Sequence, residues 1–245
     1  MNNIREILAA NQDFTITFVG DSITWGENHC TPNETYVGCF ASMLAREFPN
    51  ASVYRYDGIA GGAKDPLTGY DRYTVQSGKC GRLHVLRSGV GGNTVARAAA
   101  RFADYTGTLA SGTRSNVIFT MFGINDALYT DPDRYAEPSL FYENYCALLH
   151  RISESEPNAD LIVMSATTND QTIDAHVQKT YELAQDLSLP LIDLYRLWSD
   201  HYRQDAPNFG HGDWLAGGRD ACHPTPKAAQ IMAEAILSEW KKTWF

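Results

Sequence analysis

The chain alternates between short, mostly apolar runs and longer segments in which apolar residues recur every three or four positions. The short runs predict β-strands buried on both faces, and the longer segments predict amphipathic helices. The expected strands cover residues 14–19, 51–56, 83–87, 116–122, 160–165 and 189–194, and the expected helices cover residues 34–47, 95–105, 140–154, 173–187 and 226–242. Strands that alternate with helices in this way indicate an α/β protein whose parallel sheet is covered by helices on both faces.

The chain shows no change of composition that would indicate a linker, no internal repeat and no low-complexity segment. Residues 1–245 are therefore expected to form a single domain. The region 57–81 is rich in glycine and tyrosine and carries no clear periodicity. Long loops in compact domains are usually functional or disordered, and the aromatic content argues against disorder. We expect this region to be an ordered excursion near the functional site.

Polar residues follow the apolar pattern at four points, and three of these points come directly after an expected strand. The four clusters are Gly20-Asp21-Ser22, Gly92-Asn93-Thr94, Gly123-Ile124-Asn125-Asp126 and Asp220-Ala221-Cys222-His223. Open α/β sheets bind their ligands at the carboxyl edge of the strands, so the first three clusters are expected to meet there. The fourth cluster lies just before the last helix, which Thr225 can cap and Pro226 can begin. A loop at that position can reach back over the same edge.

These residue types are suited to nucleophilic catalysis. A carboxylate at Asp220 could orient the imidazole of His223, whose other nitrogen could then accept a proton from Ser22. A serine hydroxyl needs such a base in order to act as a nucleophile. The backbone amides of Ser22 and Gly92, with the side-chain amide of Asn125, could stabilise the oxyanion that the attack creates.

Each residue also has a structural alternative. Ser22 could be a polar loop residue, His223 a helix-start residue, Asn125 a helix cap and Asp220 a solvated loop acid. The strand, glycine-rich turn and helix at 83–105 could also indicate a nucleotide site. The G-x-G-x-x-G spacing is absent there, however, and no acidic residue is placed to accept a ribose hydroxyl. The catalytic interpretation is favoured because all four clusters occur in one order at one predicted edge.

The four clusters, beginning with GDSIT at 20–24, resemble the four blocks of the SGNH hydrolases, also called GDSL esterases or lipases. The resemblance spans about residues 14–240. It implies an α/β fold of the flavodoxin-like type, a three-layer α/β/α sandwich with a five-stranded parallel sheet. It also implies ester hydrolysis through an acyl-enzyme, with Ser22 as nucleophile, His223 as base and Asp220 as the acid that orients it. The implied oxyanion hole comprises the Ser22 amide, Gly92 and Asn125.

The natural ester is less closely defined. Members of the family act on acetylated sugars, lysophospholipids, thioesters and simple esters, and Ile23 replaces the leucine of the family name without chemical consequence. Because no long apolar loop suggests a lid for long acyl chains, a short-chain ester such as an acetylated carbohydrate is favoured. A lysophospholipase, a thioesterase and a catalytically silent glycan- or acyl-binding protein remain alternatives. The side chains expected to contact the substrate are Asp21, Trp25, Asp126 and Trp214.

The net charge and the lack of long apolar runs exclude some classes of binding partner. The formal net charge of −9 and the isoelectric point near 5.2 argue against a nucleic-acid or anionic-membrane surface. No apolar run approaches the roughly 18 residues needed to cross a bilayer, and the first residues lack the pattern of a signal peptide. We therefore expect a cytoplasmic protein with no membrane insertion, whose partner is a small-molecule or glycan ester. Its oligomeric state is not predicted.

The cysteines indicate neither a disulfide framework nor a metal site. They are odd in number, scattered and never arranged as C-x-x-C, and they are Cys30, Cys39, Cys80, Cys146 and Cys222. Cys222 beside His223 and His29 beside Cys30 could suggest zinc, but the side chains of adjacent residues diverge and the spacing does not fit. We expect no metal and no other cofactor.

Overall fold

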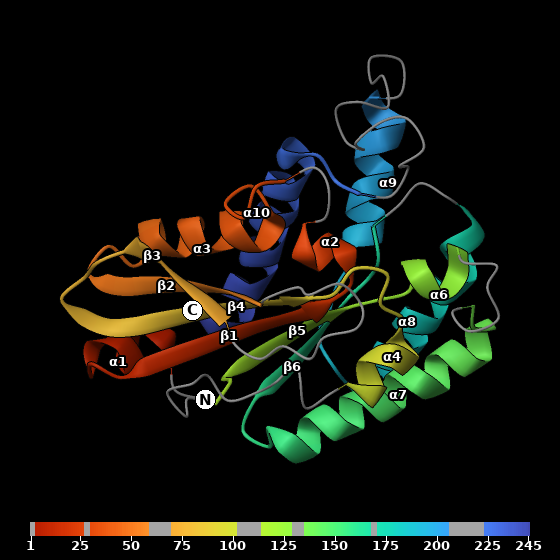
Figure 1. The fold of residues 1–245 in the computed structure, drawn as a ribbon, viewed down its shortest axis with the longest axis horizontal. Coiled ribbons are helices and arrows are strands. Elements are labelled where there is room, and N and C mark those ends of the chain that lie inside the picture. Colours follow the sequence, from red (N-terminus) through yellow and green to blue (C-terminus); the bar gives the residue numbers. More distant parts are fainter. Residues whose placement is uncertain are drawn as a thin grey trace.

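The computed structural model describes residues 3–26, 30–58, 70–101, 114–128, 135–167, 171–205 and 223–245. Strands and helices alternate along most of this length (Figure 1). The strands are β1 (Asp13–Gly20), β2 (Ala51–Gly58), β3 (Tyr70–Gln76), β4 (Cys80–Gly89), β5 (Val117–Met121), β6 (Asp160–Met164) and β7 (Leu191–Ile192). The helices are α1 (Ile4–Ala9), α2 (Ser22–Trp25), α3 (Tyr36–Glu47), α4 (Val95–Ala100), α6 (Ile124–Leu128), α7 (Pro138–Ser155), α8 (Asp174–Asp186), α9 (Leu194–Asp205) and α10 (Pro226–Trp244), with a 3-10 turn at Gln171–Ile173.

The seven described strands form one sheet in the order β3-β2-β4-β1-β5-β6-β7. Every neighbouring pair is parallel except β2 and β3, which are antiparallel. The strands β4-β1-β5-β6-β7 follow the flavodoxin-like order, in which the first strand lies between the second and the third. The predicted α/β fold class is therefore confirmed, and successive strands are added to the sheet on opposite sides of β1.

The expected number of five strands is corrected to seven, because β2 and β3 extend the sheet beyond β4. The strand β3 lies inside the region 57–81, which the sequence pattern indicated only as an excursion. Its residues 71–74 are exposed at the edge of the sheet, so the strand carries no apolar run that would identify it. Residues 59–69 of the predicted excursion lie outside the described residues.

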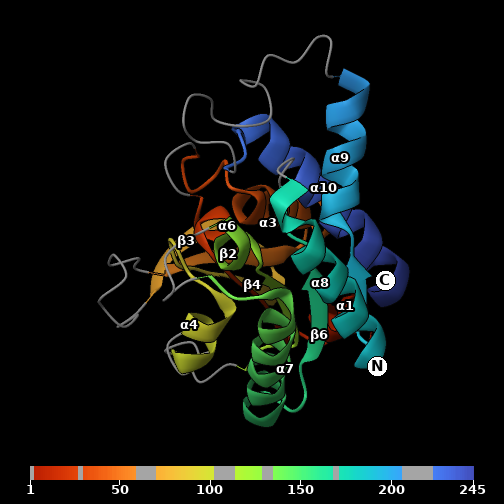
Figure 2. The same cartoon turned by 90° about the vertical axis from the view of Figure 1, so that its right-hand side faces the viewer.

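Helices cover both faces of the sheet, with α3 and α10 on one side and α4 and α7 on the other (Figure 2). The rings of Phe18 in β1 and Phe119 in β5 stack 4.7 Å apart, and Phe40 of α3 packs edge-on against Phe18 at 5.1 Å. Trp240 of α10 lies 5.8 Å from Phe40. This aromatic core holds the last helix over the first strand.

All five predicted helices are present, with differences at their ends. The helix expected at 95–105 is described as α4 only to Ala100, and residues 102–105 lie outside the described part. Helix α9 has no counterpart among the predicted helices. Thr225 caps α10 by accepting the amide of Ala228, and Pro226 is its first residue, as expected. Among the described helices, none combines the length and the apolar character needed to span a bilayer.

Candidate active site

Ser22 is the first residue of α2, the short helix that follows the central strand β1. Asp21 caps this helix, because its carboxylate accepts the amide of Ile23 at 2.9 Å. The helix lies tightly against the end of β4, where a Cβ atom added to Gly89 would be 2.2 Å from the backbone nitrogen of Trp25. Glycine at 89 thus allows α2 to approach the sheet. The Ser22 side chain is held at the carboxyl edge and is 6% exposed.

His223 meets Ser22 from the other end of the sequence. Its Nε2 atom lies 2.7 Å from Oγ of Ser22, a hydrogen bond between residues that are 201 positions apart. His223 lies two residues before Thr225, the N-cap of α10. Because α10 packs on α3 over the sheet, the start of this helix fixes where the imidazole lies. Asp220, the acid predicted to orient His223, lies outside the described residues, as does Trp214. Their roles stay predictions.

Gly92 and Asn125 lie after the two strands that flank β1. Gly92 has a φ of +65° in the turn between β4 and α4, a conformation that favours glycine. Asn125 follows Gly123 at the start of α6, and its Nδ2 atom donates to the carbonyl of Asn93 at 2.8 Å. Three neighbouring strand ends thus contribute Ser22, Gly92 and Asn125. Within the described part of the chain, neither the Ser22 amide nor the Gly92 amide has an acceptor.

Asp21 and Asp126 are buried and bind backbone groups of the protein itself. Asp126 is fully buried, and its carboxylate accepts the amide of Val95 at 3.1 Å. Burial, together with the smaller effect of the negative charge of Asp21, raises the pKa of Asp126 to about 7 against the lowering effect of the Val95 hydrogen bond. These carboxylates hold α2 and the β4–α4 turn in place. Their contact with a substrate stays a prediction.

Trp25, the third predicted substrate residue that the structure describes, ends α2 and is half-buried. Its backbone carbonyl accepts a hydrogen bond from the guanidinium of Arg87. Arg87 belongs to a buried cluster with Arg55 and Asp57 that sequence reasoning missed. The sequence did contain a signal for this cluster, because Arg87 is a charged residue at the end of the apolar run 83–87.

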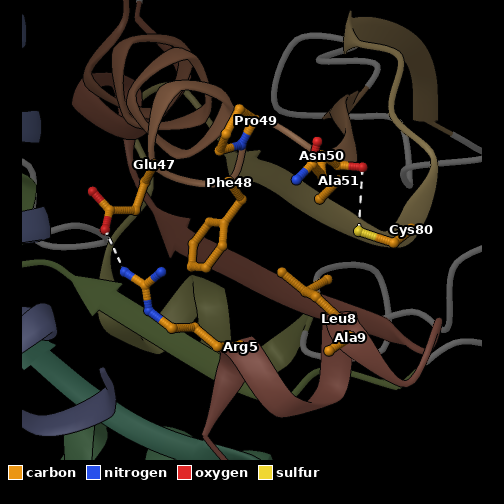
Figure 3. Close-up of a pocket in the computed structure, with 9 residues that line it drawn as sticks. All are labelled: Arg5, Leu8, Ala9, Glu47, Phe48, Pro49, Asn50, Ala51 and Cys80. Atoms are coloured by element: carbon orange, nitrogen blue, oxygen red, sulfur yellow. Dashed lines mark hydrogen bonds and ion pairs between the residues drawn. The ribbon is translucent and has the colours of Figure 1, made fainter.

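A surface pocket of about 200 Å³ lies at the opposite, amino edge of the sheet, where β2 and β4 begin. Its residues come from α1, the end of α3 and these two strands (Figure 3). Arg5 and Glu47 form an ion pair of 2.8 Å there, and the thiol of Cys80 donates to the carbonyl of Asn50. This pocket is therefore remote from Ser22.

In the ranges that the structure describes, no three His, Cys, Asp or Glu side chains gather in an arrangement that could hold a metal ion. Cys222 and His29 lie outside those ranges.

The family model described as the GDSL-like Lipase/Acylhydrolase family matches residues 57–231. This match includes the turn at Gly92, the Asn125 segment and His223, and it begins after Ser22. A search of curated proteins found no match.

Solved structures with the same fold are more numerous. A two-domain esterase (CEX) active on acetylated mannans has a TM-score of 0.67 at 16% identity, covering 98% of this chain and 51% of that one. The chain thus spans about half the length of that esterase. The lipase/acylhydrolase from Enterococcus faecalis has a TM-score of 0.62 at 19% identity, covering 94% and 96% of the two chains. The acetyl xylan esterase AlAXEase has a TM-score of 0.61 at 18% identity, covering 92% and 98%. At these identities the likeness shows the fold alone.

Proposed function

Because the chain belongs to the GDSL-like lipase/acylhydrolase family, we propose that it is a serine esterase that cleaves short-chain acyl esters through an acyl-enzyme. The observation that carries this proposal is the 2.7 Å hydrogen bond between Ser22 Oγ and His223 Nε2. In the first step, Ser22 Oγ attacks the ester carbonyl carbon while His223 Nε2 accepts the hydroxyl proton. Asp220 is assigned the role of orienting the imidazole through its other nitrogen.

The oxyanion formed by this attack is assigned to the edge where β4, β1 and β5 end. The amides of Ser22 and Gly92 and the side chain of Asn125 would donate to it. Donors fixed before the reaction stabilise developing charge most effectively, because they need not reorganise. The bond from Asn125 to the Asn93 carbonyl uses one Nδ2 proton and supports the orientation in which the second proton faces the oxyanion.

The remaining steps use the same residues. As the tetrahedral intermediate collapses, the bond to the alcohol oxygen breaks and His223 gives that oxygen its proton, leaving an acyl group on Ser22. A water molecule then gives a proton to His223 and attacks the acyl carbonyl, which releases the carboxylic acid and restores the serine hydroxyl.

For the substrate, we propose an acetylated carbohydrate. Structural neighbours with the same fold are described as an esterase active on acetylated mannans and an acetyl xylan esterase, which supports this choice. The half-buried Trp25, three residues after Ser22, offers an aromatic side chain of the kind that stacks on sugar rings. A lysophospholipid, a thioester and mere binding without turnover are the competing possibilities.

The proposed nucleophile is tested with Ser22→Ala, using p-nitrophenyl acetate as the substrate. The variant is expected to fold and to retain less than about a hundredth of the wild-type kcat/KM, because removing a catalytic nucleophile normally has a much larger effect. Ser42→Ala, which removes a hydroxyl from the middle of α3, is the matched control and is expected to keep full activity. A fluorophosphonate probe should label the wild type at Ser22 and leave Ser22→Ala unlabelled. Activity of Ser22→Ala above that level would contradict the proposal.

The substrate class is tested separately. Acetylated xylan and mannan oligosaccharides, a lysophospholipid and an acyl thioester are compared by kcat/KM in parallel assays. The acetylated sugars are expected to give the highest value. If kcat/KM is higher for the lysophospholipid or for the acyl thioester, the carbohydrate assignment is rejected and the esterase assignment stands.

A further inference from the structure

Three charged side chains are buried together beneath the carboxyl edge of the sheet. Arg55 and Asp57 lie two residues apart on β2, and Arg87 on β4 is the register partner of Asp57. Their exposed fractions are 2%, 6% and 5% respectively. On the same face of these strands, the preceding residues Val53 and Val85 belong to the hydrophobic core. The core thus ends in a charged cluster at the level of the proposed active site.

One carboxylate serves both arginines in this cluster. Oδ1 of Asp57 accepts from Nε of Arg55 and from Nε of Arg87, each at 2.9 Å, and Oδ2 accepts a second bond from Arg55 at 3.0 Å. With two cations and one anion, the cluster carries a formal charge of +1. A buried net charge is unfavourable for folding unless other groups compensate it. Asp57 is thus the carboxylate that holds both arginines in this cluster.

The two arginines differ in what else they bind. Arg55 donates to the side chain of Asn33 and lies under the ring of Tyr73, 5.0 Å from its centroid. Arg87 instead donates to the backbone carbonyl of Trp25, the last residue of α2. Of the contacts that the structure describes for these two arginines, the one from Arg87 to Trp25 connects the cluster to the helix that begins with Ser22.

Helix α2 is a single turn, so a constraint at its end acts directly on its beginning. The amide of Gly26 donates to the carbonyl of Ser22 at 2.8 Å, and the amide of Trp25 donates to the carbonyl of Asp21 at 3.1 Å. A second attachment comes from the hydroxyls of Thr24 and Tyr36, which lie 2.8 Å apart. Losing the bond from Arg87 would leave the helix attached and would release its last residue.

We propose that Arg87 is a positioning residue for the nucleophile: its bond to the Trp25 carbonyl fixes α2 so that Ser22 Oγ is held against His223 and the oxyanion donors. Asp57 fixes Arg87 in turn, through the bond to Nε. The proposal rests on the proposed function, since it assigns Arg87 to the nucleophilic step of that same site. Arg55 holds the same carboxylate through two bonds, and its described contacts do not include α2.

Arg87→Met and Arg55→Met form a matched pair that tests the proposal. Each variant removes one of two arginines from the same cluster and leaves Asp57 paired with the other, so that the remaining pair is formally neutral. Arg87→Met is expected to lower kcat for p-nitrophenyl acetate by about ten- to a hundredfold with KM changed less than about twofold, because small misplacements of reacting groups have effects of this size. The rate of fluorophosphonate labelling, which requires only the attack by Ser22, should fall in parallel. Arg55→Met is expected to stay within about twofold of the wild type in both rates.

Arg87→Lys provides the conservative variant. A lysine keeps the charge and can reach either the carbonyl or Asp57 but has no fork of donors for both, so an intermediate kcat is expected. Equal kcat values for Arg87→Met and Arg55→Met, or a change in KM without a change in kcat, would overturn the positioning role. If Arg87→Met and Arg87→Lys both fail to fold while Arg55→Met folds, Arg87 is a folding residue and the proposal is also overturned. Failure of the proposed function would look different, because Ser22→Ala would then keep its activity whatever the arginine variants do.

Discussion

Replacing Asp126 by asparagine is expected to change how the stability of the protein depends on pH. The carboxyl group is fully buried, accepts the amide of Val95 and lies near the negative charge of Asp21, and its pKa is raised from 3.8 to about 7. An aspartate in an unfolded chain has a pKa of about 3.9. The folded state therefore holds a proton on Asp126 over a range of pH in which the unfolded state has lost it.

The sign of the effect follows from this difference. Below about pH 4 both states are protonated at this position, and the carboxyl group contributes no pH dependence to stability. As the pH rises from about 4 to about 7, the Asp126 carboxyl group loses its proton in the unfolded state but keeps it in the folded state, so the free energy of unfolding falls. A rise in pKa from 3.8 to about 7 corresponds to about 4 kcal/mol, since one pKa unit is about 1.4 kcal/mol. Asparagine keeps an oxygen that can accept the Val95 amide and has no proton to lose.

Urea unfolding of the wild type and of Asp126→Asn at intervals between pH 4 and pH 9 measures this contribution. The free energy of unfolding of the wild type, relative to that of the variant, is expected to fall by about 4 kcal/mol between pH 4 and pH 8 and then to stay level. Asp71→Asn, which replaces an exposed carboxylate of β3, serves as the control, and its difference from the wild type should stay within about 0.5 kcal/mol throughout. The reasoning would be refuted if the difference in the free energy of unfolding between the wild type and Asp126→Asn varied by less than about 1 kcal/mol over this range.

Three further substitutions address the site and its supports. Asn125→Ala should lower kcat for ester hydrolysis by about 10²–10³-fold with little change in KM, and a kcat within about threefold of the wild type would exclude Asn125 from the oxyanion hole. Gly89→Ala places a Cβ atom 2.2 Å from the Trp25 nitrogen, so both activity and melting temperature should fall, and a fully active variant would show that α2 can shift without consequence. Thr225→Ala removes the cap of α10 and should lower the free energy of unfolding by about 1 kcal/mol in urea titrations, whereas an unchanged midpoint would mean that the cap contributes nothing.

The central part of the fold could be predicted because its strands are buried on both faces. The sequences of β1 and β5 consist mainly of apolar and β-branched residues, so each strand and the polar residues that follow it were evident. The edge strand β3 could not be recognised in this way, since its exposed side chains include Asp71 and Arg72. Helix α9 was missed because its charged residues obscure an apolar stripe that includes the fully buried Leu194 and Trp198.

The candidate site could be predicted in part for a related reason. Parallel strands bring their carboxyl ends together, so residues that follow β1, β4 and β5 had to be neighbours. The direction in which a side chain points is not encoded in this way. Asp126 follows Asn125 immediately, yet it turns inward to the Val95 amide. The bond from Arg87 to the Trp25 carbonyl depends on how closely α2 approaches β4, and a sequence pattern does not contain that distance.

The hydrogen bond between Ser22 and His223 joins residues that the ribosome adds 201 steps apart. During translation, the sheet strands and the turns that bear Gly92 and Asn125 emerge while the proposed base is still unsynthesised. A nascent chain at that stage would hold an unassisted hydroxyl and would not hydrolyse the esters that it meets. In the proposed mechanism, Ser22 can therefore act as a nucleophile only after α10 has docked over β1 and brought His223 beside it.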